Sequence, residues 1–380
     1  GFTWGTQQVE AARRAVSLSP GRASTLVNLA TALYSLGHAK SLQGKDPLAE
    51  HEEGRKVAAE AARLEPWDPR APHLGLLNAL EEVRFRMTHG QDPTEFLGAA
   101  QALATRLEGM RGLSPKLLRP CLADLRSMQA QATWDQGGDP DPLQQEAQAQ
   151  YEAMHAEDPG RFNRTSDIGY GAVIWAQTRV AQGRSVTEVL QRAEPALKAG
   201  LARWPQQPLL HYYVAWLKAL QLYDRKGAST LARDPALGRE ALAAYERAFK
   251  IMANPGVREI RGWIHLARAE AGLPGAAAAA CADFEDVVKR DPGSKEPQMG
   301  WVRALRLRGR PGDLERAEAL LARQPSEVQG DPELLLVRAL LALDRGRKAE
   351  ATEYQRKALA KQPRVAGHPV CALMGEAAPR

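Results

Sequence analysis

An internal repeat constrains this chain more than any other feature. Six amphipathic stretches, each closed by a proline, recur along the 380 residues at 11–20, 58–66, 148–159, 242–255, 281–292 and 353–363. Their small or aromatic residues are spaced by four and then three positions, as in Ala147, Tyr151 and Met154, which places them on one helix face. A second helical pattern, ending in small residues and a glycine, occupies 26–37, 262–272, 299–309 and 334–346. Such repeats bury their apolar faces only by stacking on their neighbours.

Asp-Pro dipeptides punctuate the chain between these stretches. They occur within the segments 43–47, 89–93, 136–142, 231–235 and 329–333. An aspartate that precedes a helix accepts a backbone N–H bond, and a proline at the first helical position sacrifices no hydrogen bond. Each Asp-Pro therefore predicts the start of a helix.

The alternation resembles the tetratricopeptide repeat, a helix–turn–helix unit that stacks into a solenoid. The family's small residue in the first helix matches Ala30, Ala267 and Ala339, and its glycine near the end of that helix matches Gly37, Gly309 and Gly346. Its closing proline matches Pro20, Pro66, Pro159, Pro205, Pro292 and Pro363. The resemblance implies an all-α fold, a right-handed superhelical solenoid of about eight helix-turn-helix units.

The closing prolines divide the chain into a proposed N-terminal remnant helix at 1–21, a repeat array at 22–363 and a C-terminal cap or tail at 364–380. The expected units are 22–66, 67–114, 115–159, 160–205, 206–254, 255–292, 293–325 and 326–363. The first five exceed the family's usual length, and the extra residues fall between the two helices of a unit.

Lengthened units with a Gly-x-Asp-Pro insertion look like those that follow the catalytic domain in some bacterial serine/threonine protein kinases. This narrower resemblance implies a regulatory or docking module, and the missing initiator methionine suggests a piece of a larger protein. The chain itself has no His-Arg-Asp, Asp-Phe-Gly or phosphate-binding loop motif, so we expect it not to be an enzyme. A free-standing adaptor unrelated to a kinase is the alternative.

The composition limits which classes of protein this chain can belong to. Only three cysteines occur, so a disulfide scaffold is excluded and a cytoplasmic location is expected. The eight histidines and three cysteines show no short metal-ligand spacing, so neither a metal nor another cofactor is predicted. No apolar run is long enough to predict membrane insertion. The net charge of +6 is concentrated in the second half of the chain, whose basic residues are either a binding surface or merely solvated.

The resemblance implies that first-helix side chains line a concave groove that holds a protein or peptide. Its register selects Asn28, Thr31 and Tyr34 in the first segment, Arg261, His265 and Arg268 in a later one, and Arg303 and Arg306 in the next. Arginine forks suit carboxylates and phosphates, so an acidic or phosphorylated segment is the expected ligand. The competing interpretation is that these arginines pair with neighbours such as Glu259, Glu270 and Glu296.

Two other classes stay open. A helical solenoid can enclose a small-molecule pocket, although no convergent catalytic motif supports one. An RNA-binding repeat would show base-reading residues at one register in every unit, and no such code is visible, so nucleic acid is not expected. The sequence does not specify the oligomeric state.

Overall fold

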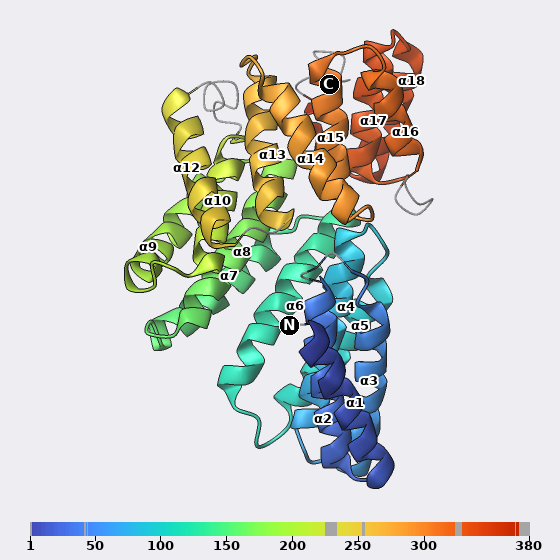
Figure 1. Cartoon of the computed structure of the whole chain (residues 1–380), viewed down its shortest axis with the longest axis vertical. Coiled ribbons are helices and arrows are strands. Elements are labelled where there is room, and N and C mark those ends of the chain that lie inside the picture. Colours follow the sequence, from blue (N-terminus) through green and yellow to red (C-terminus); the bar gives the residue numbers. More distant parts are fainter. Residues whose placement is uncertain are drawn as a thin grey trace. The chain divides into compact units, whose positions relative to one another are not determined.

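The computed structural model describes residues 2–41, 43, 45–224, 234–252, 255–323, 329–368 and 370–371. Over these residues the chain is helical throughout, with turns and short connections and no β-strand. It divides into two compact units, unit 1 at Gly1–Ala132 and unit 2 at Thr133–Arg380 (Figure 1).

Unit 1 consists of antiparallel helices that follow one another along the chain. They are α1 (Phe2–Leu18), α2 (Ala23–Ser41), α3 (Leu48–Leu64), α4 (Arg70–Thr88), α5 (Thr94–Glu108) and most of α6 (Pro115–Asp135). The helices of unit 2 are α7 (Asp141–Glu157), α8 (Phe162–Ala181), α9 (Thr187–Arg203), α10 (Pro208–Gln221), α12 (Pro235–Ile251), α13 (Pro255–Glu270), α14 (Ala276–Arg290), α15 (Lys295–Arg308), α16 (Asp313–Ala322), α17 (Pro332–Asp344), α18 (Lys348–Lys361) and the 3₁₀ helix η1 (Pro363–Gly367).

The helices pack in the manner of stacked pairs. Helices that follow one another pack together, as α2 does on α3 and α13 on α14, and alternate helices also touch, as α2 does α4 and α13 does α15. This is the packing that a repeat with two small-residue faces requires. The predicted all-α, tetratricopeptide-like helical repeat is confirmed.

The Asp-Pro dipeptides begin helices as predicted. Asp234 accepts hydrogen bonds from the backbone N–H groups of Ala236 and Leu237 at the start of α12. Asp331 does the same for Glu333 and Leu334 at the start of α17. These bonds satisfy donors that have no partner within the helix.

One predicted helix end is wrong. Gly309 and Gly346 do take positive φ values, 62° and 73°, beside the ends of α15 and α17. Gly37, by contrast, lies inside α2, which continues to Ser41. A Cβ atom at position 37 would come within 2.5 Å of the His51 ring, so this glycine provides space for a neighbouring side chain instead of a helix stop.

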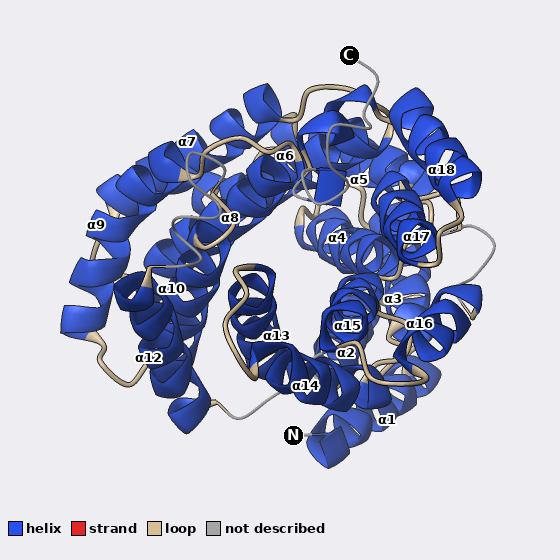
Figure 2. Cartoon of the chain, turned by 90° about the horizontal axis from the view of Figure 1, so that it is seen from above, coloured by secondary structure: helices blue, strands red, loops and turns tan. Residues whose placement is uncertain are grey.

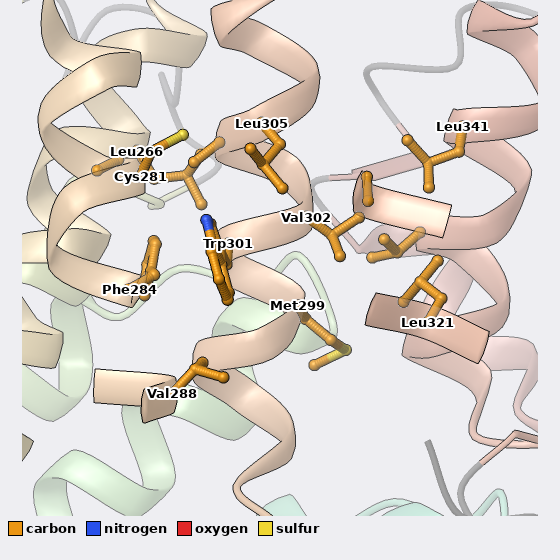
Figure 3. Close-up of a cluster of buried hydrophobic side chains, with 14 of the residues drawn as sticks. Leu266, Cys281, Phe284, Val288, Met299, Trp301, Val302, Leu305, Leu321 and Leu341 are labelled. Atoms are coloured by element: carbon orange, nitrogen blue, oxygen red, sulfur yellow. The ribbon is translucent and has the colours of Figure 1, made fainter. Parts of the chain in front are cut away.

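In the core between α13 and α17, glycines again make room for the side chain of a neighbouring helix. Phe284 of α14 is fully buried among Leu266, Cys281 and Trp301 (Figure 3). Its ring rests on two glycines, Gly262 of α13 and Gly300 of α15, where a Cβ atom would overlap it. The absent side chains let three helices approach around one aromatic ring.

We expect Gly300→Ala to destabilise unit 2, because the added methyl overlaps the Phe284 ring in a close-packed core. Overpacking of this kind costs about 1–3 kcal/mol, which thermal or urea unfolding would detect. Gly238→Ala is the matched control. A Cβ atom on that helical glycine of α12 would lie 4.0 Å from Arg268 Cδ, an ordinary contact, so alanine there should be neutral or stabilising by about 0.5–1 kcal/mol. Equal effects of the two changes would contradict this account.

Unit 2 closes on itself through its last described residues. Val365, Val370 and Cys371 are buried in one cluster with Trp134 and Ala181 from the beginning of the unit. Gln362 Nε2 donates a hydrogen bond to the Trp134 carbonyl, and the Arg364 guanidinium lies 3.3 Å from the Asp139 carboxylate. We call this contact the closure seam. Because it joins the two ends of the helix series, unit 2 forms a closed turn with an inner and an outer side.

Candidate functional site

The inner side of unit 2 is formed by one row of helices. Helices α8, α10, α13, α15 and α17 contact one another in order, each to the next member of the row. In Figure 2 they lie inside α9, α12, α14, α16 and α18. Charged residues on three of these helices lie close enough to influence one another's ionisation. We call the group that lies there the inner ionic cluster: Glu259, Glu270, Lys295, Glu296, Arg303, Asp331 and Glu333.

The N-termini of α15 and α17 supply one half of this cluster. Lys295 Nζ lies 3.0 Å from Asp331 Oδ2 and 3.8 Å from Glu296 Oε1. Burial opposes the charge on Lys295, but Asp331, Glu296 and Glu333 outweigh it, so the lysine pKa lies well above its usual range. Burial also raises the pKa of Glu333 to about 7, helped by the charges of Asp331 and Glu296 and opposed by Lys295. One lysine thus faces several carboxyl groups, and they do not all ionise easily.

A buried arginine holds the other half together. The Arg303 guanidinium on α15 donates to Glu270 Oε1 of α13 at 2.5 and 3.1 Å. It also lies over the rings of Tyr223 and Trp263, 5.9 and 5.7 Å from their centres. The cation–π contacts and the two hydrogen bonds to a single carboxylate oxygen together restrict the orientation of the guanidinium plane.

His368 connects the cluster to the closure seam. Its Nδ1 accepts a hydrogen bond from the backbone N–H of Val370. Burial lowers the pKa of His368 to about 3, and the nearby Arg303 and Lys295 lower it further against the opposing charge of Asp331. The histidine is therefore neutral at physiological pH and is a structural member of the seam.

Glu259, near the start of α13, is the most perturbed carboxyl group. Trp263 Nε1 donates to Glu259 Oε1 at 3.1 Å. Burial raises the pKa of Glu259 to about 8, and the charges of Glu296 and Asp291 add to this, while the tryptophan bond opposes it. Carboxyl groups with perturbed pKa values are more common at functional sites than elsewhere.

The balance of charge in this cluster is acidic. Five carboxyl groups face two cations, although the whole chain carries a net charge of +6. Glu296 remains accessible, with 40% of its side chain exposed. Carboxyl groups therefore outnumber cations in the inner ionic cluster.

The three groove candidates in unit 1 all lie on α2. Asn28 and Thr31 are exposed, and the Thr31 hydroxyl donates back to the Val27 carbonyl at 2.9 Å. Tyr34 is partly buried and stacks on His38, and burial together with Glu81 raises the pKa of its hydroxyl to about 12. Their common helix agrees with the predicted register, and their role in binding stays a prediction.

The structure separates the candidates of α13 from the inner ionic cluster. Arg261 forms a bidentate pair with Asp283 of α14 and lies 5.2 Å from the centre of the Tyr245 ring of α12. Arg268 lies beside Gly238 of α12. His265, between them in the sequence, is partly buried, and burial lowers the pKa of its ring. Arg261 and Arg268 therefore point toward the outer helices.

The two candidates of α15 also have acidic partners. Arg303 pairs with Glu270, one of the residues that the competing interpretation named. Arg306 pairs with Asp344 at the end of α17 and lines a pocket of about 310 Å³ with Leu307, Gly309, Arg310 and Leu314. Three of the four arginines thus pair with three different carboxylates, and Arg268 lies against α12.

Sequence reasoning missed most of the inner ionic cluster. Glu259, Trp263 and Glu270 are spaced by four and seven, so they share a face of α13 that differs from the face of Arg261 and Arg268. Glu296 and Arg303 are likewise seven apart on α15. This spacing was a usable signal, but which of two polar helix faces turns inward depends on the neighbouring helices.

The described residues offer neither a metal site nor a membrane-spanning helix. Among the described residues, no group of three or more His, Cys, Asp or Glu side chains is arranged to hold a metal ion. No helix in the described part of the chain has the length and apolar character needed to cross a bilayer.

No protein-family model and no curated protein matches this sequence. Solved structures with a similar arrangement include yeast Tom70, at 15% identity and a TM-score of 0.44, over 98% of this chain and 62% of that one. A monomeric mutant of IFIT1 with m7Gppp-AAAA matches at 13% identity and a TM-score of 0.48, over 95% and 68% of the two chains. The chain thus spans less than two thirds of the Tom70 structure. The TM-scores of both matches lie below 0.5.

The perturbed carboxyl groups predict how stability depends on pH. Glu259 and Glu333 have raised pKa values, about 8 and 7, against roughly 4.3 in an unfolded chain. The folded state therefore binds protons more tightly, and this stabilisation is complete below about pH 4.3 and is lost as the pH rises to 8. We expect the Tm of unit 2 to fall by several degrees between pH 5 and 8, since about 1 kcal/mol moves the Tm by roughly 2–4 °C at this size.

The double variant Glu259→Gln/Glu333→Gln should flatten that dependence and raise the Tm at pH 8. Glu353→Gln on the outer helix α18 is the control, because Arg356 and Lys357 lower the pKa of Glu353 to about 2, outside this range. Calorimetry at a series of pH values would measure both. An unchanged slope in the double variant would show that other groups cause the dependence.

Proposed function

We propose that this chain is a non-catalytic interaction module that holds a protein segment against the inner side of unit 2, in the cytoplasm. One observation carries the proposal. The inner ionic cluster gathers carboxyl groups from three helices, and two of them have pKa values near or above neutrality. The cluster holds more carboxyl groups than cations, and gathering acidic side chains inside a fold costs free energy that a bound cation would offset.

The chemistry of the cluster supports a partner segment rich in lysine or arginine. A cation placed beside Glu259, Glu296 or Glu333 would favour their ionised forms and lower their pKa values. An acidic or phosphorylated segment, the ligand expected from the sequence, would have to displace Asp283, Glu270 or Asp344 from the arginines that they hold. Binding of a basic segment is therefore expected to be more favourable in free energy than binding of an acidic one.

Fluorescence anisotropy with labelled peptides tests this proposal. A Lys/Arg-rich peptide should bind, and its affinity should fall about tenfold in Glu296→Gln/Glu333→Gln and fall with added salt. Glu353→Gln should bind as the wild-type chain does. Preferential binding of a Glu-rich or phosphorylated peptide, lost in Arg261→Ala or Arg306→Ala, would favour the acidic ligand and refute the basic one.

The finer proposal is that the module is the docking or regulatory part of a bacterial serine/threonine kinase. Its support is the resemblance of the lengthened units with Gly-x-Asp-Pro insertions, and a free-standing adaptor is the alternative. Sequencing the reading frame upstream of Gly1 tests it. A kinase domain there, whose substrate choice changes when this region is deleted, is the expected result. An upstream region without a kinase domain would contradict the kinase proposal and favour the free-standing adaptor.

A further inference from the structure

Three apolar side chains project from one edge of unit 1. Leu18 is 75% exposed, Trp67 74% and Leu117 52%, and each lies at or next to a turn that joins two helices of a pair. These turns are α1–α2, α3–α4 and α5–α6. Because the helices alternate in direction, every second turn lies at the same end of the stack. Other large exposed apolar residues of the described chain are Trp4, at the opposite end of α1, and Leu209 in unit 2.

Direct contacts confirm that these turns share an edge. Arg106 of α5 donates to the Pro66 carbonyl beside Trp67 at 3.5 Å, and a Cβ at Gly112 would lie 3.9 Å from Pro69. Beneath them, Val16, Ala23, Leu64 and Ala71 belong to one apolar cluster that joins the first two turns. Figure 1 shows the α1–α2 turn and the α5–α6 connection at the lower end of unit 1.

The same edge is rich in cations. Its turns and the adjoining helix ends carry eight exposed basic side chains: Arg14, Arg22, Arg63, Arg70, Arg106, Arg111, Lys116 and Arg119. They carry four carboxylates: Glu60, Glu65, Asp68 and Glu108. The α2–α3 and α4–α5 turns at the other edge carry the opposite excess, with Lys40, Lys45 and Arg86 against Asp46, Glu50, Asp92 and Glu95.

We propose that this edge of unit 1 is a docking surface for an anionic lipid bilayer. Tryptophan and leucine at protruding turns enter the headgroup region, and surrounding arginines and lysines are attracted to anionic lipids. Stacked helix pairs lie roughly 8–10 Å apart, so the three apolar tips extend over roughly 20 Å. Separate tips of this kind suit a flat surface, whereas a protein partner usually covers one continuous apolar patch.

The bilayer fits better than nucleic acid for a chemical reason. Phosphate backbones would explain the cations, but base stacking requires aromatic rings, and two of the three tips are leucines. Leucine at 75% exposure gains free energy only from an apolar environment. This contact is independent of the inner ionic cluster, which lies in unit 2.

Co-sedimentation with lipid vesicles tests the proposal with the whole chain. Binding to vesicles that contain about 30% phosphatidylserine should exceed binding to pure phosphatidylcholine about fivefold or more, and should weaken with salt. The triple variant Leu18→Ser/Trp67→Ser/Leu117→Ser should lose about tenfold in affinity. Circular dichroism would verify that the variant is folded, as expected for substitutions at exposed positions.

Two controls distinguish binding through this edge from non-specific hydrophobic adsorption and from a general effect of charge. Trp4→Ser removes another exposed tryptophan, 63% exposed against 74% for Trp67, from the other end of α1 and should bind vesicles as the wild-type chain does. Arg22→Glu/Arg111→Glu should weaken binding strongly, and Lys45→Glu on the opposite edge should not. Equal binding to neutral and anionic vesicles, or equal losses in the triple variant and Trp4→Ser, would overturn the proposal. Tighter binding of a short single-stranded RNA with the same dependence on the variants would assign the edge to nucleic acid instead.

Discussion

The fold depends on glycines that lie beneath the side chains of neighbouring helices. Phe284 rests on Gly262 and Gly300, and in the same unit Tyr151 rests on Gly171. Unit 1 repeats the arrangement with polar residues, since Gly37 receives His51 and Gly54 receives Asn78. In each pair a Cβ atom would come closer than 3.0 Å to the ring or amide, so the helices could not approach as they do. These glycines therefore determine how closely the neighbouring helices approach one another.

Local chemistry explains which features could be predicted from the sequence. An Asp-Pro pair determines a helix start through bonds to residues two or three positions away, so its outcome depends on little else. The role of Gly37 was missed because a glycine late in a helix looks the same whether it ends the helix or makes room for His51. Only the packing of α3 against α2 distinguishes the two, and that contact is not visible in a local pattern.

The candidate site was less predictable for a related reason. Arg261 and Glu259 lie two residues apart on α13, yet one pairs with α14 and the other lies among the residues of the inner ionic cluster. A helix with polar residues on two faces does not reveal which face turns inward. Glu270 also meets Arg303 across 33 positions of sequence, a pairing that was anticipated as a possibility and that needed the structure to establish.

The two proposed binding surfaces differ in the sign of their charge and in the burial of their charged residues. The inner ionic cluster places partly buried charges close together, so each charge affects the ionisation of its neighbours. The exposed edge of unit 1 carries cations in high dielectric, where each contributes little and only the sum matters. Affinity at the first should therefore depend on single residues, and at the second on the number of residues retained.

The closure seam limits how unit 2 can evolve. An open stack of helix pairs can gain or lose a pair by duplication or deletion, because each pair contacts only its neighbours. In unit 2 the residues around Val365 and Cys371 must meet those around Trp134 and Ala181. One pair more or fewer would change the circumference of the turn and leave these surfaces without a partner. Unit 2 therefore resembles a ring of fixed size, whose length cannot drift while its seam is kept.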